Sequence, residues 1–191
     1  MSHLPLIIGL ILFLGVHRIP AMPGLRASLH ERFGAGGYKG LFSLGSFLGL
    51  GLIIWGFGLA RQAPVSLYVP PAWLANFTAE LMIPVFILLV AYGLPGRIAA
   101  FTRHPMLLAI KIWALAHLFS NGLLHEVLLF GGFLVWAILD RISLKKRGVA
   151  GATVGARPMV YDGVALFGGL AAYVIFMIWL HPLLIGVPAV Y

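Results

Sequence analysis

The chain of 191 residues contains no cysteine. This absence excludes disulfide bonds, thiol chemistry, and iron–sulfur or zinc sites that depend on cysteine ligands. Histidine, with seven residues in the chain, is the commonest metal ligand in proteins and therefore the side chain to follow.

Charged residues are also scarce, at 9% of the chain, and only five of them are acidic. Hydrophobic residues make up 61%, and the mean hydropathy is +1.03. Soluble domains are about 45–50% apolar, so a soluble fold of this length has no means of burying so much apolar surface. The composition predicts an integral membrane protein.

Long apolar segments give the expected architecture. A membrane-spanning helix needs about 20 mostly apolar residues, and six segments approach or reach this length, at residues 4–22, 41–60, 72–94, 105–119, 123–139 and 164–187. The longest polar stretches between them are residues 18–40 and 140–162. We expect an all-α, polytopic transmembrane helix bundle of about six spans, formed by a single domain over residues 1–191. Glycines 45, 49 and 51 are expected to permit close helix packing.

Basic residues are distributed unevenly over the loops. Eleven of the thirteen lie in alternate loops, at positions 18, 26, 32, 39, 97, 103, 141, 145, 146, 147 and 157. The positive-inside rule makes these loops cytoplasmic and places both termini in the periplasm. The positive charge is thus attributed to topology and to contact with the lipid bilayer, and nucleic acid is not an expected partner.

One stretch concentrates ionisable groups beside a predicted span. Thr102-Arg103-His104-Pro105-Met106 runs directly into the apolar segment that carries Lys111 and His117. Ionisable residues at membrane depth are costly, so each is a functional candidate. Proline after His104 suits the first turn of a helix.

Helical phase and depth separate these candidates. At about 100° per residue, His104 and Lys111 share a face, whereas His117 points away from both and shares its face with Asn121. Glu80 of the third predicted span lies at a depth similar to that of His117, so its carboxylate is a candidate to orient the imidazole. Lys111 is expected to extend its side chain to the cytoplasmic surface.

His17, near the cytoplasmic end of the first predicted span, has a structural and a ligating interpretation that the residues alone leave open. The histidines near the interfaces are expected to be solvated, and they are His3, His30, His125 and His181.

The chain resembles the NnrU family of bacterial membrane proteins along essentially its whole length. The segments that carry the resemblance are Gly15-Val16-His17, Pro23-Gly24-Leu25-Arg26, Gly40-Leu41-Phe42-Ser43-Leu44, Thr102-Arg103-His104-Pro105-Met106, Trp113-Ala114-Leu115-Ala116-His117-Leu118 with Asn121-Gly122, and His181-Pro182-Leu183-Leu184-Ile185-Gly186-Val187. The resemblance implies a protein of the bacterial inner membrane that is linked to denitrification and nitric oxide metabolism.

The same domain is similar to the 15-cis-ζ-carotene isomerases, which are membrane haem b proteins with two histidine ligands. This resemblance implies haem b as cofactor, with His17 and His117 as iron ligands. It also implies a redox-gated mechanism: reduction by a redox partner frees one histidine, and the open iron site isomerises an apolar polyene or binds nitric oxide. The polar residues expected around such a site are Glu80, Arg103, His104, Lys111 and Asn121.

Several alternatives stay open at this stage. By helix rise, His17 lies about 9 Å nearer the cytoplasmic side than His117, so His17 with His104, or His117 with His125 or His181, are alternative ligand pairs. An Arg-His-Pro sequence also occurs in membrane methyltransferases, but Met106 and the lack of a following acidic run depart from their pattern. Two functions of other classes also stay open: a transporter that uses Glu80 and Lys111, and a non-catalytic assembly factor. If the protein is an enzyme, an isomerase-like haem enzyme is expected.

Overall fold

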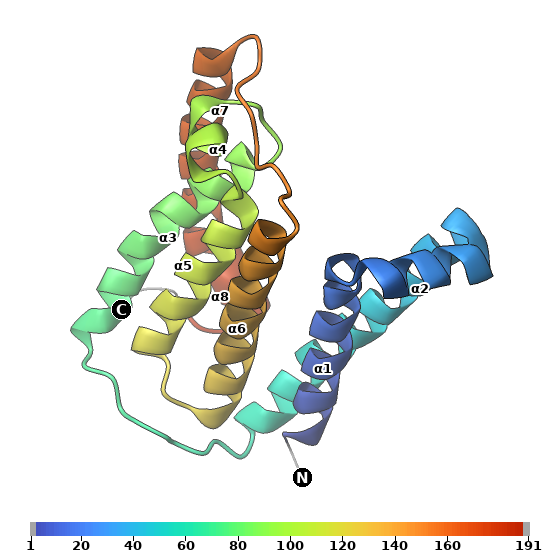
Figure 1. Ribbon diagram of the computed structural model, residues 1–191. Helices are drawn as coiled ribbons and strands as arrows, with labels where there is room; N and C mark the ends of the chain where they lie inside the picture. The colour runs from blue at the N-terminus through green and yellow to red at the C-terminus, as the bar shows by residue number, and fades with distance from the viewer. Residues whose placement is uncertain (1–2, 189–191) are drawn as a thin grey trace. The chain divides into compact units, whose positions relative to one another are not determined.

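The computed structural model describes residues 3–188, and their regular secondary structure is helical apart from one isolated bridge between Ser66 and Leu123 (Figure 1). The predicted all-α fold is confirmed. The elements are α1 (Leu4–Arg18), η1 (Ile19–Ala21), α2 (Pro23–Arg61), α3 (Trp73–Ala91), α4 (Arg97–Thr102), α5 (Pro105–Ser120), α6 (Leu124–Lys146), α7 (Pro158–Ile175), η2 (Phe176–Leu180) and α8 (His181–Ile185).

Among the described residues, five helical stretches are long and apolar enough to cross a membrane, and they are Leu4–Ala21, Pro23–Arg61, Trp73–Ala91, Leu124–Lys146 and Pro158–Ile185. The remaining predicted span corresponds to α5, an apolar helix of 16 residues. At about 1.5 Å per residue α5 is about 24 Å long, which is shorter than the ~30 Å hydrocarbon layer of a typical bilayer.

The chain divides into two compact units. Unit 1 comprises Met1–Tyr68 with Gly122–Ser143, and unit 2 comprises Val69–Asn121 with Leu144–Tyr191. Residues 1–2 and 189–191 of the predicted single domain lie outside the described part of the chain.

In unit 1, α1 and α2 pack so closely that their backbones meet at glycines. A methyl group added to Gly49 would lie 2.8 Å from the backbone nitrogen of Phe13, and one added to Gly56 would collide with the backbone of Leu6. Gly9 of α1 makes the reciprocal approach to α2, where an added methyl group would lie 2.6 Å from the backbone nitrogen of residue 53. Helices in a bilayer gain stability from this kind of close contact, because lipid tails are as apolar as the side chains.

The polar stretch after the first predicted span differs from expectation. The loop expected at residues 18–40 is largely helical, because α2 begins at Pro23 and includes a break at Gly34, whose φ is 67° and ψ is 174°. Only glycine adopts this conformation readily, since an L side chain would clash with the backbone there. Figure 1 shows the first part of α2 leading away from the end of α1 and the later part returning beside it.

In unit 2, α3 is the central helix and packs against both α5 and α7. Its buried residues Met82, Val85 and Leu88 form a core with two alanines of α5. A methyl group added to Gly169 of α7 would lie 2.6 Å from the Ile87 Cα of α3, so α7 also relies on close backbone approach.

The glycine contacts of α1 and α2 lead to a stability prediction. We expect Gly49→Ala and Gly56→Ala each to destabilise the protein by about 1–3 kcal/mol, because the added methyl group meets backbone that has to move. The apparent melting temperature in detergent should fall by several degrees for each variant, at about 2–4 °C per kcal/mol for a chain of this size.

Gly51 is the matched control, because a methyl group there would meet nothing within 4 Å. The expectation that Gly51 mediates packing is therefore wrong, whereas it holds for Gly49. Gly51→Ala should leave the melting temperature unchanged or raise it slightly, since alanine is the better helix former. Equal melting temperatures for all three variants would contradict the glycine-packing account.

Candidate functional site

His17 lies on the last turn of α1 among aromatic rings from three helices. Its ring centroid is 4.2 Å from that of Phe13, 5.2 Å from that of Phe42 and 6.2 Å from that of Trp136. The imidazole Nδ1 donates a 2.7 Å hydrogen bond to the Phe13 carbonyl one turn earlier. In a neutral imidazole, this bond leaves the lone pair on Nε2.

His117 of α5 repeats this arrangement in unit 2. Its Nδ1 donates a 2.8 Å hydrogen bond to the carbonyl of Trp113, and the two rings lie 5.6 Å apart. The preceding carbonyl, that of Ala116, accepts a 2.8 Å hydrogen bond from the Thr78 hydroxyl of α3. The backbone beside His117 is therefore anchored to the central helix of the unit.

A third histidine also uses its Nδ1 for a hydrogen bond to a backbone carbonyl. His181 follows η2, a π-helical turn, and its Nδ1 donates a 2.8 Å hydrogen bond to the Val187 carbonyl. Its imidazole lies within electrostatic range of His117 in the same unit. His117 with His181 stays an alternative ligand pair, and both residues belong to unit 2.

Three other predicted polar residues lie on α3 and α5 of unit 2. Glu80 is exposed on α3 and is within electrostatic range of the Tyr173 hydroxyl. Lys111 is partly buried on α5, and Asn121 ends that helix by donating its backbone N–H to the His117 carbonyl at 2.8 Å. The His117 ring is oriented by Trp113, and its pairing with Glu80 stays a prediction.

Arg103 and His104 form a tight turn between α4 and α5. The His104 N–H donates to the Thr102 carbonyl at 2.7 Å, and Arg103 between them has φ 61° and ψ −42°. This is a γ-turn with positive φ, a strained conformation for a residue with a side chain. The Arg103 carbonyl in turn accepts a 2.7 Å bond from the Ala152 N–H, so the loop before α7 holds the turn in place.

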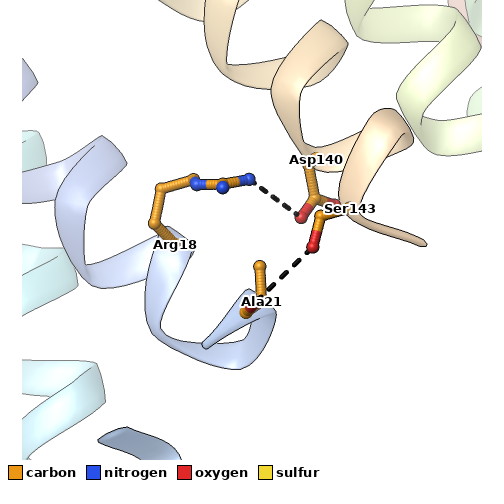
Figure 2. Close-up of polar contacts among 4 residues, drawn as sticks. All are labelled: Arg18, Ala21, Asp140 and Ser143. Atoms are coloured by element: carbon orange, nitrogen blue, oxygen red, sulfur yellow. Dashed lines mark hydrogen bonds and ion pairs between the residues drawn. The ribbon is translucent and has the colours of Figure 1, made fainter. Parts of the chain in front are cut away.

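A polar cluster closes the end of α1 in unit 1. Arg18 Nη1 lies 3.7 Å from Asp140 Oδ1, within ion-pair range but beyond hydrogen-bond length, and the Ser143 hydroxyl lies 3.5 Å from the Ala21 carbonyl (Figure 2). These contacts join the end of α1 to α6. The ion pair involves Arg18, the residue that directly follows His17.

The opposite end of α6 buries a histidine that was expected to be solvated. His125 is 1% exposed, and its ring lies 4.8 Å from Phe57 and 6.3 Å from His3. Its Nδ1 has no hydrogen-bond partner among the residues that the structure describes. The expectation of a solvated His125 is wrong, because packing between α2 and α6 covers the residue. Beside it, Glu126 accepts the Leu123 N–H at 2.9 Å and caps α6.

The Glu126 carboxylate also influences Tyr68, in the loop between α2 and α3. Burial, together with this nearby negative charge, raises the pKa of the Tyr68 phenol. The backbone N–H groups of Leu67 and Tyr68 both donate to the Gly122 carbonyl, so the loop is held against the start of α6.

Within residues 3–188, no group of three or more histidine, cysteine or carboxylate side chains is arranged to hold a metal ion.

A family model described as NnrU protein matches residues 5–189, which is nearly the whole chain. The chain belongs to the NnrU family. No curated protein and no solved structure matches it significantly. Membership confirms the resemblance, and the apolar helices of this NnrU protein support its membrane character.

The strained turn of this NnrU protein leads to a second prediction. Arg103→Gly should raise the apparent melting temperature or leave it unchanged, because relief of about 1–3 kcal/mol of strain offsets the ~1 kcal/mol that glycine costs through greater chain entropy. Thermal unfolding in detergent measures the effect.

Arg97→Gly is the control, since Arg97 opens α4 with ordinary helical geometry. That variant should lower the melting temperature, because glycine is a poor helix former. If both variants lower it equally, Arg103 carries no strain.

Proposed function

We propose that this NnrU-family protein resides in the bacterial inner membrane, holds haem b through His17 and His117, and acts in nitric oxide metabolism. The observation that carries the proposal is the common orientation of the two rings. In each case Nδ1 donates to the carbonyl four residues earlier, at 2.7 Å for His17 and 2.8 Å for His117.

This orientation suits an iron ligand for a physical reason. Histidines that bind metals commonly donate the remote ring N–H to a carbonyl or carboxylate, which fixes the tautomer and makes the ligating nitrogen more basic. Aromatic rings one turn away, Phe13 and Trp113, border the imidazoles and supply the flat apolar surface that a porphyrin favours.

His17 and His117 would hold the haem, which would supply an iron centre able to bind nitric oxide. The chain itself contributes the two oriented imidazoles and their aromatic surroundings. A redox partner that delivers electrons is part of the proposal.

A second candidate function is the haem-dependent isomerisation of an apolar polyene. An open groove of about 530 Å³ in unit 1 favours it, because the groove is lined mainly by apolar side chains and glycines of α1 and α6. Trp136 lines this groove and also packs edge-on against His17, so an elongated apolar molecule there would lie close to the candidate ligand. Conversion of an added cis-polyene by the reduced protein, followed by chromatography, distinguishes this function from nitric oxide binding.

The proposal includes a topology with both termini in the periplasm, and the placement of eleven basic residues in alternate loops supports it. We expect a C-terminal alkaline phosphatase fusion to be active and a C-terminal green fluorescent protein fusion to be dark. The opposite pattern would place the C-terminus in the cytoplasm and overturn this topology.

The haem proposal is tested by absorption spectroscopy of protein purified in detergent from cells with ample haem. The parent should show a Soret band, and both His17→Gly and His117→Gly should lose or shift it, because each removes one of the proposed iron ligands. Imidazole added to the buffer should restore the band in each variant, which a purely structural role of the histidine would not allow.

His30→Gly is the control, because His30 stacks on Tyr38 at 4.2 Å and should not affect the spectrum. His181→Gly tests the alternative pair: loss of the band there, with retention in His17→Gly, assigns the ligands to His117 and His181 instead. A folded, colourless parent protein would refute haem binding and favour a transporter or assembly factor.

A further inference from the structure

The first part of α2, residues 23–33, has the features of a helix that lies in a membrane surface. Pro23 occupies its first turn, and Gly34 ends it with a conformation reserved for glycine. We call these eleven residues the surface helix. Pro23 and Gly34 thus determine where this helix begins and ends, independently of the long apolar part of α2 that follows.

The polar cluster in Figure 2 indicates the depth in the membrane at which the surface helix begins. Arg18 and Asp140 form an ion pair, and Ser143 lies beside the carbonyl of Ala21, two residues before the helix begins. Charged groups avoid the hydrocarbon layer, so this cluster marks the edge of the membrane for unit 1. The surface helix therefore begins at the interface rather than inside the bilayer.

One face of the surface helix is apolar. Leu25, Leu29 and Phe33 follow each other at intervals of four residues, which places them within about 80° of one another. Leu25 and Phe33 are exposed, so the rest of unit 1 does not cover this face fully.

Positive charge borders the apolar face on both sides. Arg26 and Arg32 lie about 60° to either side of Leu29, whereas Ala27 and Glu31 lie about 160° from it. The Arg32 guanidinium lies over the Phe33 ring, 5.5 Å from its centroid, so this cation is held toward the apolar side. Helices with an apolar face flanked by arginines bind in the plane of the interface, with the cations at the level of the headgroups.

The turn at Gly34 fixes the direction of the surface helix. The His30 ring, on the surface helix, stacks on Tyr38 beyond the break with centroids 4.2 Å apart. This contact bridges the kink and keeps the helix from continuing in line with the rest of α2. The break therefore sets the surface helix at an angle to the membrane-spanning part of α2.

We propose that residues 23–33 form an interfacial helix that buries Leu25, Leu29 and Phe33 among the lipid tails and binds anionic phospholipid headgroups through Arg26 and Arg32. Charge complementarity identifies the lipid: two arginines border the apolar face, and the only carboxylate of the helix, Glu31, is on the opposite face. The proposal does not depend on haem binding.

Because the chain has no cysteine, single cysteines can carry a nitroxide label on the full-length protein in reconstituted bilayers. A label at Leu25→Cys should collide more with oxygen, which partitions into lipid. A label at Ala27→Cys, on the opposite face, should collide more with a water-soluble nickel chelate. Equal exposure of both labels to the chelate, or shielding of the Leu25 label from both reagents by a protein contact, would overturn the proposal.

Lipid charge is tested with the same label. Replacing part of the phosphatidylcholine with phosphatidylglycerol should move the Leu25 label deeper or restrict its motion, and Arg26→Gln with Arg32→Gln should abolish this response. Arg26→Lys with Arg32→Lys should keep it, as should the matched pair Lys145→Gln with Lys146→Gln, which removes the same charge from α6. An unchanged response in the double glutamine variant refutes headgroup binding, and its loss in the α6 pair as well shows a general charge effect.

Discussion

The close backbone approach of α1 and α2 is the contact on which the rest of unit 1 depends. Without water to drive apolar surfaces together, two helices in a bilayer stay associated through short-range packing, and bulky side chains would hold them apart. Gly9, Gly49 and Gly56 remove that obstacle. The approach brings Phe42 of α2 to His17 of α1, so the surroundings of the candidate ligand follow from glycines far from it along the helices.

The candidate ligands obtain their orientation from their own helices. His17 and His117 each bond the carbonyl four residues earlier, an oxygen that the helix already places beside the ring. A carboxylate from another helix would have to be positioned by tertiary packing, as was expected of Glu80. An intrahelical acceptor needs only regular helical geometry, so the ring orientation is defined within each unit by itself.

The sequence predicts the apolar helices well because hydropathy over about 20 residues is a strong signal. Hydropathy does not predict the helix at residues 23–33, because the polar residues there favour a loop. Pro23 was an available signal, since proline favours the first turn of a helix, as Pro105 and Pro158 also do here. Burial of His125 and the γ-turn at Arg103 depend on distant packing partners, which no local pattern reveals.

The last turn of α1 carries both the candidate ligand His17 and Arg18, which forms an ion pair with Asp140. Adjacent helical residues point about 100° apart, so one turn directs His17 toward the aromatic rings and Arg18 toward Asp140. Asp140 lies four residues after Trp136, one turn along the same face of α6, so the ion pair and the imidazole–indole contact share a single register between α1 and α6. A shift of that register would disturb both contacts, so the ion pair helps to hold the His17 imidazole beside Trp136.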